Sequence, residues 1–420
     1  MTIHTASPSF PDVAARDIRI TIGVVDPTSG GYFIARRVLE RGFSCVAICS
    51  AGPVKSDLDF TSVLEATSED FDLDMARYAY DAIIPGAESG VRLSEDLADR
   101  MGLPGNDPAT TDWRRNKTAM AKAARDAGIA LCRQARCRTL DDCVAWADSI
   151  GFPVVVKPEA SSGSDLVRVC QSPRELLQHA AAILRGVDKY GQNTEGVLLQ
   201  EYMVGDEYTV DGVAQDGRLT IFSVGRYRKI NRDGAIIYDK IDFLAPDHPD
   251  VDSRILTYCD EVAEAVGVRV GPVHVEIMMT AGGPLLVEIA ARAHGGIGTS
   301  VIDANFAPSF IDAIIDAYLD GPAQEQPATV TQRRSASIAF LISGREGRLV
   351  SAPGLVAIQA LPSFVRMKWF VAPGERIAKT VDLATCPALI ELVHARAEVI
   401  EADIAKIREI EASNSMLEIM

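Results

Sequence analysis

The sequence is poor in positive charge. Its 420 residues include 42 Lys and Arg against 58 Asp and Glu, which gives a formal net charge of −16 at pH 7. A protein with this excess of negative charge repels nucleic-acid phosphates and anionic lipid surfaces. We therefore expect no nucleic-acid partner and no membrane partner, and any anionic ligand must be met by a local group of cations.

Long apolar runs and export signals are also missing. No apolar run approaches the roughly 20 residues that a membrane-spanning helix needs, and the N-terminus lacks a basic segment followed by an apolar one. Eight cysteines are scattered without a Cys-x-x-Cys pair or a close Cys/His group. This spacing is typical of reduced thiols rather than of disulfides or zinc, so the expected location is cytoplasmic.

The first third of the chain lacks the common nucleotide-binding fingerprints. The stretch "IRITIGVVDPTSGGYFIARRVLERGFSCVAIC", residues 18–49, predicts a strand, a turn, an amphipathic helix and a second strand. Its turn "TSGG" has neither the G-x-G-x-x-G spacing nor a G-K-[ST] ending. We interpret it as a tight turn rather than a phosphate loop, at the start of a small doubly wound domain.

Lys157 is the first lysine that indicates a ligand. It ends the apolar strand "VVVKP", and the small-residue loop "EASSGSD", residues 159–165, follows it. The backbone N–H groups of such a loop can close over phosphates beside a fixed cation. From this stretch alone, a solvated lysine before a hairpin stays an open alternative.

Two helices are predicted around this loop. "DWRRNKTAMAKAARDAGI", residues 112–129, reads as one basic, alanine-rich helix. "SPRELLQHAAAILRG" reads as a helix with Ser172 as N-cap, Pro173 at its first position and Glu175 completing a capping box.

Acidic and basic residues then surround a predicted hairpin. Glu201 and Glu207 flank the turn in "QEYMVGDEYTVDG"; they suit an adenine edge and ribose hydroxyls, or they are ordinary solvated acids. The hairpin is expected to turn at residues 215–218. The run "RYRK", residues 226–229, either closes over phosphates or a substrate carboxylate, or forms an exposed cationic loop.

Two carboxylates lie in the apolar hairpin "GPVHVEIMMTAGGPLLVEIAARAHGG", residues 271–296. A turn centred on Gly282 places Glu276 opposite Glu288, with Cβ atoms about 4.5–5.5 Å apart. Two unpaired anions would repel there, whereas a shared divalent cation such as Mg²⁺ removes the repulsion. The alternative is a pair of acids on the exposed face of a hairpin. His274 lies on the face of Glu276.

These segments, in this order, resemble the ATP-grasp superfamily. The series is Lys117, Lys157 with its Ser/Gly loop, the "QEYMVGDEYTVDG" turn, and the paired acids with "VEIAARAHGG". The chain is most similar to carboxylate–amine ligases of the L-amino acid ligase (bacilysin synthetase) type, over about residues 18–411. The resemblance implies an α/β and α+β fold: an N-terminal Rossmann-like domain, an ATP-grasp fold of two antiparallel α+β subdomains, and a small C-terminal β-rich domain with a final helix.

The expected domain boundaries follow from the same resemblance. They are a flexible arm at 1–17, a Rossmann-like domain at 18–115, the first ATP-grasp subdomain with its phosphate loop at 116–200, the second with the metal site at 201–325, and a C-terminal domain at 331–411. In the C-terminal domain, residues 335–377 predict short β segments between Gly/Pro turns, and residues 387–410 predict a helix. A homodimer is expected.

The resemblance also assigns the site residues. ATP contacts fall on Lys117, Lys157, Ser162, Gly163, Ser164, Glu201, Tyr202, Val204 and Glu207. Metal contacts fall on Glu276 and Glu288, and catalysis on Arg292. From the mechanism, we expect Arg292, Gly295 and Gly296 to contact the substrate, and His274 either contacts the substrate or is a buried core histidine. The usual Asn of the family's Asn-x-Arg segment is replaced by Ala290, so the number of Mg²⁺ ions stays open; Mn²⁺ is an alternative metal.

The implied reaction joins an amino acid or small carboxylic acid to an amine, which we expect to be an amino acid. It runs through an acyl phosphate and releases ADP and phosphate. Three alternatives remain: another ATP-grasp branch (a purine-biosynthetic carboxylase or formyl-transfer ligase), a non-catalytic ATP-binding subunit, and a Rossmann-type oxidoreductase. The missing dinucleotide fingerprint argues against the last.

Overall fold

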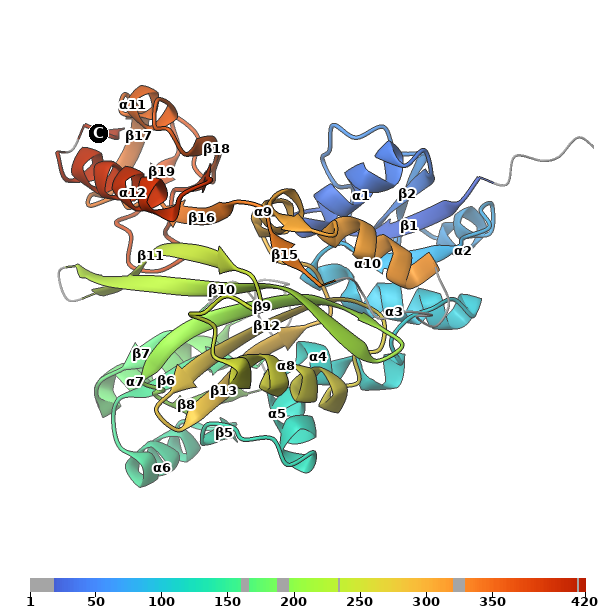
Figure 1. The fold of residues 1–420 in the computed structure, drawn as a ribbon. Coiled ribbons are helices and arrows are strands. Elements are labelled where there is room, and N and C mark those ends of the chain that lie inside the picture. Colours follow the sequence, from blue (N-terminus) through green and yellow to red (C-terminus); the bar gives the residue numbers. More distant parts are fainter. Residues whose placement is uncertain (1–18, 160–165, 187–195, 233–234, 320–328, 414) are drawn as a thin grey trace, which may run out of the picture.

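A computed structural model describes residues 19–159, 166–186, 196–232, 235–319, 329–413 and 415–420. The arm expected at residues 1–17 and the loop that contains Ser162, Gly163 and Ser164 lie outside these residues. Figure 1 shows the N-terminal unit in blue and the C-terminal unit in red on one side of a set of long strands, with a smaller sheet beyond them. Within the described residues, no helix is long and apolar enough to cross a membrane.

The N-terminal unit is a parallel four-stranded sheet in the order β3-β2-β1-β4. Its elements are β1 (Thr21–Val25), α1 (Gly30–Glu40), β2 (Ser44–Cys49), β3 (Ser62–Glu65), α2 (Phe71–Met75), β4 (Ala82–Pro85), η1 (Glu88–Gly90) and α3 (Val91–Met101). Both β1 and β2 are buried along their whole length, which explains their unbroken apolar sequence. The predicted strand, turn, helix and strand are confirmed.

The segment that follows contains two short helices where one was predicted. After η2 (Pro108–Thr110), α4 (Asp112–Arg115) ends at Asn116, and α5 (Lys117–Asp126) begins directly after it. Asn116 is extended, with φ −105° and ψ 116°, and its side chain accepts hydrogen bonds from the N–H groups of Thr118 and Ala119. The prediction of a single helix was wrong because an asparagine that caps the second helix must leave the helical conformation.

The smaller sheet has the order β5-β8-β6-β7, with all neighbours antiparallel. Its elements are β5 (Gln134–Cys137), α6 (Leu140–Ile150), β6 (Val154–Pro158), β7 (Arg168–Cys170), α7 (Pro173–Arg185) and β8 (Val197–Glu201). Ser172 caps α7 as predicted. However, the Glu175 carboxylate accepts from the N–H of Gln171 rather than from Ser172, so the capping box is incomplete.

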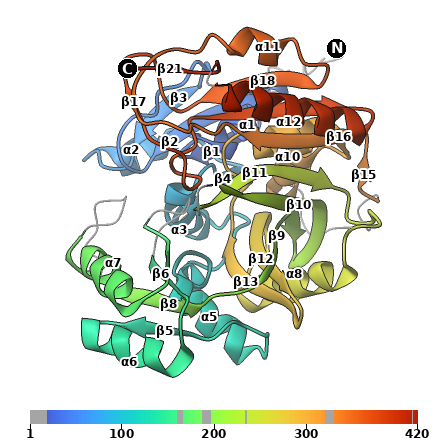
Figure 2. The ribbon, with the colours of Figure 1, turned by 90° about the vertical axis from the view of Figure 1, so that its left-hand side faces the viewer.

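The large sheet has eight strands in the order β13-β12-β9-β10-β11-β16-β20-β18. They are β9 (Gly205–Gln215), β10 (Arg218–Arg232), β11 (Ala235–Leu244), β12 (Gly271–Thr280), β13 (Gly283–Ala290), β16 (Ser335–Phe340), β18 (Phe364–Trp369) and β20 (Ala388–His394). The hairpin predicted to turn at residues 215–218 is confirmed. Strands of the C-terminal unit thus continue the sheet that carries the paired acids (Figures 1 and 2).

The remaining helices and short strands lie outside the large sheet, and these strands form a two-stranded and a three-stranded sheet. They are α8 (Ser253–Ala265), α9 (Gly298–Asn305), β14 (Phe306–Ala307), α10 (Phe310–Leu319), β15 (Thr331–Gln332), β17 (Gly347–Ser351), α11 (Leu355–Gln359), β19 (Arg376–Ile377), α12 (Ala397–Ala412) and β21 (Glu418–Ile419). Helix α10 packs between α1 and β9, and one apolar cluster that includes Ile34, Val38 and Ile314 joins the N-terminal unit to the large sheet.

Two C-terminal predictions were wrong. Residues 388–394 form strand β20 and not the start of a helix, because their alternation buries Ile390 and Leu392 against the C-terminal core. Residues 355–359 form helix α11 instead of a β segment. The helix expected near the end of the chain is present from Ala397 onward.

Candidate functional site

The small and large sheets face each other across a cavity of about 430 Å³. The small sheet and its neighbouring turn contribute Val155, Lys157, Pro158, Val167, Val169, Gln200, Tyr202, Met203 and Val204. The other wall consists of Lys117, Gly205, Glu207, Lys229, Tyr238, Glu276, Met278, Val287 and Glu288. The lining combines apolar side chains with charged ones, as expected of a site that holds both an aromatic base and phosphates.

Glu276 and Glu288 are cross-strand partners in this wall, as the sequence predicted. The turn itself is Ala281-Gly282, so its centre lies half a residue before the predicted one. Continued without interruption, that register would pair Glu276 with Val287. A register shift after Glu276 pairs Ile277 with Leu286, which leaves Val287 as an extra residue and brings Glu288 opposite Glu276.

Two lysines lie beside the acid pair. Lys117, the first residue of α5, is 7% exposed, and its Nζ is 3.0 Å from Oε2 of Glu288. Lys157, at the end of β6, is 3% exposed. Burial and the nearby charge of Lys117 lower the pKa of Lys157 to about 8. A nearby anionic ligand would favour the charged form of Lys157 and so oppose this lowering of its pKa.

Glu207 lies at another part of the cavity wall. The Tyr238 hydroxyl donates to its carboxylate at 3.0 Å and 3.1 Å, and Lys229 forms an ion pair with it. Burial raises the pKa of Glu207, in spite of the Lys229 charge. Lys229 is the member of the basic run 226–229 that lines the cavity. In contrast, Arg228 pairs with Asp239 and with Glu401 of α12.

The turn between β8 and β9 forms the edge of the cavity. Tyr202, Met203 and Val204 line it, and Val204 is 76% exposed. The Glu201 side chain is bound elsewhere: its carboxylate accepts from the backbone N–H and the Nε of Arg133, at 2.8 Å and 2.6 Å. Any contact of Glu201 with a base in this position therefore uses its backbone.

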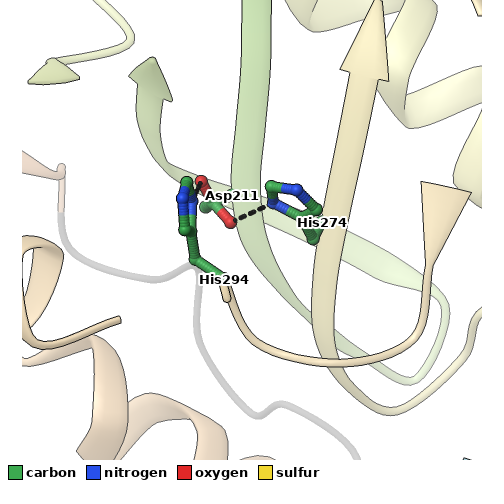
Figure 3. Close-up of side chains that lie close together, drawn as sticks. All are labelled: Asp211, His274 and His294. Atoms are coloured by element: carbon green, nitrogen blue, oxygen red, sulfur yellow. Dashed lines mark hydrogen bonds and ion pairs between the residues drawn. The ribbon is translucent and has the colours of Figure 1, made fainter. Parts of the chain in front are cut away.

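Next to the acid pair, Asp211 of β9 connects two histidines (Figure 3). Its Oδ1 accepts from Nδ1 of His274, and its Oδ2 accepts from Nδ1 of His294, both at 2.8 Å. His274 Nε2 lies 3.4 Å from Oε1 of Glu276. Burial lowers the pKa of His274, but the Asp211 charge outweighs it and raises that pKa to about 9.

Arg292 and the glycines after it form the side of the site that faces the N-terminal unit. Arg292 Nη1 donates to the carbonyl of Ala293 at 3.1 Å, and its Nε is 3.4 Å from Oε2 of Glu88 in η1. The N–H of Gly296 donates to Oγ of Ser29 at 2.7 Å, and Gly295 lies beside the same serine. The "TSGG" turn therefore contacts the candidate substrate side.

Comparison with known proteins identifies the family of the segment that contributes most of the residues around this cavity. Residues 150–301, which contain Lys157, Glu207 and both paired acids, match the ATP-grasp domain family. The chain carries an ATP-grasp domain.

The relatives of this chain include ligases. It is 28% identical to dapdiamide A synthase of Enterobacter agglomerans, over 93% of this chain and 96% of that protein. It is 26% identical to an L-arginine-specific L-amino acid ligase of Bacillus subtilis, over 54% of this chain and 55% of that one. The crystal structure of an L-amino acid ligase from Bacillus licheniformis superimposes with a TM-score of 0.78 at 17% identity, over 96% and 98% of the two chains.

Sequence reasoning missed three residues of the candidate site. Asp211 and Tyr238 were not singled out, and Ser29 was assigned only to a turn. Asp211 did leave a signal, because Glu207, Thr209 and Asp211 alternate along one face of an otherwise apolar strand. Tyr238 and Ser29 left none, because their contacts are to residues far away in the chain.

Proposed function

We propose that this protein is an ATP-dependent ligase that joins the carboxylate of an amino acid or small acid to an amine, which we take to be that of another amino acid. The observation that carries the proposal is the group of opposed Glu276 and Glu288 with Lys117 and Lys157 at one cavity. Two acids for a metal and two buried cations for phosphates are the elements that phosphoryl transfer requires.

The residues present fit a bound Mg²⁺, with Mn²⁺ as an alternative. Glu276 and Glu288 provide hard oxygen donors from two hydrogen-bonded strands, and both side chains remain partly accessible, at 30% and 16%. A divalent cation held there would neutralise charge on the transferring phosphoryl group. The Ala290 side chain offers no ligand, so these two acids are the side chains that we assign to the metal.

We assign the rest of the cavity to ATP. Lys117 and Lys157 bind phosphates, the segment from Tyr202 to Val204 holds the base, and Glu207 accepts from ribose hydroxyls. Ser162, Gly163 and Ser164 remain assigned to the phosphate loop by sequence alone. The apolar side chains of Val155, Val169 and Met278 surround the space for the base.

The reaction proceeds in two steps. A carboxylate oxygen of the first substrate attacks the terminal phosphorus of ATP, the bond to the ADP oxygen breaks, and an acyl phosphate results. The amine nitrogen then attacks the carbonyl carbon, the bond to the phosphate oxygen breaks, and the amine loses a proton. We assign stabilisation of the oxyanion to Arg292, because the N–H of Gly296 already donates to Ser29.

The likeness to dapdiamide A synthase over nearly the whole of both chains supports this assignment. The L-amino acid ligase relative supports an amino acid as one substrate. Gly295 and Gly296 remain our candidates for substrate contact, because they lie beside Ser29 of the N-terminal unit. Both ring nitrogens of His274 face other side chains, Asp211 and Glu276, so we assign His274 to positioning instead of substrate contact. We also propose a homodimer, which light scattering of the purified protein tests.

The products of ATP test the mechanism. We expect ADP and phosphate when the protein is incubated with Mg-ATP and pairs of amino acids or small acids. With ¹⁸O in the substrate carboxylate, one labelled oxygen should appear in the released phosphate, because that oxygen joins carbon to phosphorus in the intermediate. Formation of AMP and pyrophosphate, or unlabelled phosphate beside an amide product, would contradict the proposal.

A further inference from the structure

Asp211 is a buried carboxylate that accepts hydrogen bonds from two imidazole rings. Its exposure is 0%, and each carboxylate oxygen accepts one Nδ1–H at 2.8 Å. The rings come from different parts of the chain: His274 from β12, and His294 from the segment between β13 and α9. In Figure 3 the carboxylate lies between the two rings, whose centroids are 4.7 Å apart.

Through His274, Asp211 is connected to Glu276, one of the two acids assigned to the metal. With Nδ1 directed at Asp211, the other nitrogen of His274 is directed at Glu276, 3.4 Å away. The orientation of the His274 ring, and with it the position of the Glu276 carboxylate, therefore depends on Asp211.

Through His294, Asp211 is connected to the turn that follows Arg292. His294 is held at its ring by Asp211 and at its carbonyl by the Thr299 hydroxyl, at 2.8 Å each. Gly30 of the N-terminal unit lies against the same carbonyl, and Gly296 is bound to Ser29. Asp211 thus attaches this turn to β9 of the large sheet, in addition to the ring contact between His294 and Phe243 of β11.

We propose that Asp211 is a positioning residue that couples the two halves of the site: through His274 it places the metal acid Glu276, and through His294 it places the substrate-side turn next to Arg292. The inference rests on the proposed function and assigns Asp211 no contact with substrate. A carboxylate is required because it accepts from both rings. An asparagine offers one acceptor and one donor, so at most one ring keeps its hydrogen bond unchanged.

Three variants separate the two branches. His294→Asn should raise the KM for the acid and amine substrates while the Mg²⁺ concentration needed for nucleotide binding stays unchanged. His274→Asn should raise that Mg²⁺ concentration. Asp211→Asn should do both, each by roughly 10–100-fold, the range typical for loss of an outer partner of a metal ligand. Mg²⁺-dependent nucleotide binding is measured by calorimetry, without turnover.

Ser223→Ala is the matched control. Ser223 is the cross-strand partner of Asp211 on β10, is equally buried, and its hydroxyl has no hydrogen-bond partner among the described residues. Its truncation disturbs packing at the same depth without touching either histidine bond, so both constants should stay within about 2-fold of wild type. Equal shifts in Ser223→Ala and Asp211→Asn would overturn the inference.

A spectroscopic test uses the unaltered protein, should Asp211→Asn fail to fold. In ¹⁵N-histidine NMR spectra, His274 and His294 should both carry the proton on Nδ1 and show it slowly exchanging. Protonation of either ring at Nε2 alone, or a transition metal bound by Asp211, His274 and His294, would overturn the inference. Amide formation by the wild type then still supports the proposed function, whereas a wild type that forms no amide contradicts that function and leaves the NMR result standing.

Discussion

Lys157 shows how burial changes the behaviour of a single site residue. Its ammonium group is 3% exposed next to a second cation, which lowers its pKa from 10.5 to about 8. Between these two values the unfolded chain holds a proton that the folded protein lacks. The free energy of unfolding therefore rises with pH in this window, and the contribution is unfavourable below pH 8.

The same shift predicts proton uptake when ATP binds. Near pH 8 a fraction of Lys157 is neutral, and a phosphate beside it should restore the proton. Calorimetric titration of Mg-ATP at about pH 8.5, in two buffers with different ionisation enthalpies, should reveal net uptake of protons. Lys157→Met, which preserves the volume of the side chain, should lose that uptake. Unchanged uptake in the variant would assign the proton to another group.

Glu288 provides the test of the metal assignment. Glu288→Gln should lower turnover by at least about 100-fold, because Mg²⁺ loses one of two carboxylates. The melting temperature should change little, since loss of the ion pair with Lys117 is offset by relief of the repulsion from Glu276. Assay over a range of Mg²⁺ concentrations measures the effect, with the exposed Glu261→Gln of α8 as control. Near-normal turnover would remove Glu288 from the metal site.

Among the elements, α4 is joined to its neighbours by a buried ion pair. Arg114 of α4 donates from Nε and Nη2 to the two oxygens of Glu95 in α3, at 3.0 Å and 2.9 Å. The side chains are 0% and 4% exposed. Arg114 Nη1 also donates to the carbonyl of Val266 at the end of α8, at 2.8 Å. This single side chain therefore ties the N-terminal unit to the helix that packs against the hairpin of Glu276 and Glu288.

Breaking this pair should cost far more than breaking an exposed one. Glu95→Gln leaves the Arg114 charge buried without its counter-ion, and we expect a loss of about 3–5 kcal/mol in the free energy of unfolding. The control is Asp72→Asn, which removes the pair with Arg100, whose side chains are 75% and 59% exposed. That loss should stay below about 1 kcal/mol. Urea denaturation of both variants measures the difference, and equal losses would contradict the argument.

For the whole molecule, the cavity predicts stabilisation by nucleotide. Residues from both sheets line it, so Mg-ATP bound there would contact both sheets at once. At a hundred times the dissociation constant, the expected gain is about 2.7 kcal/mol, seen as a higher melting temperature. NAD should have no effect, and Lys157→Met should weaken the response to Mg-ATP. Protection by NAD alone would instead favour the N-terminal unit as the nucleotide site.

Much of the site was predictable because it lies within a single hairpin. Glu276 and Glu288 are twelve positions apart in chain segments joined by a tight turn, and the two-residue period of a strand decides which face each occupies. The pairing was predicted even though a bulge at Val287 and a shifted turn, whose effects cancel, were not. In the same way, β1 and α1 were predicted from the apolar pattern of their own residues, and α7 from its capping residues.

Tertiary structure alone decided the contacts between distant segments. Three such contacts depend on how separate units pack. They are the ion pair of Lys117 with Glu288, the hydrogen bond of Gly296 to Ser29, and the hydrogen bond of His294 to Asp211. The pairing of β20 with β16 also depends on packing between segments that are far apart in the chain. For this reason residues 388–394 form a strand where a helix was predicted. Spacing along the chain determines which face of an element a residue occupies, but only the burial of apolar faces against one another determines which elements meet. The amino acids themselves therefore determined the chemistry available to this protein, and packing determined which of its acids, lysines and histidines act together.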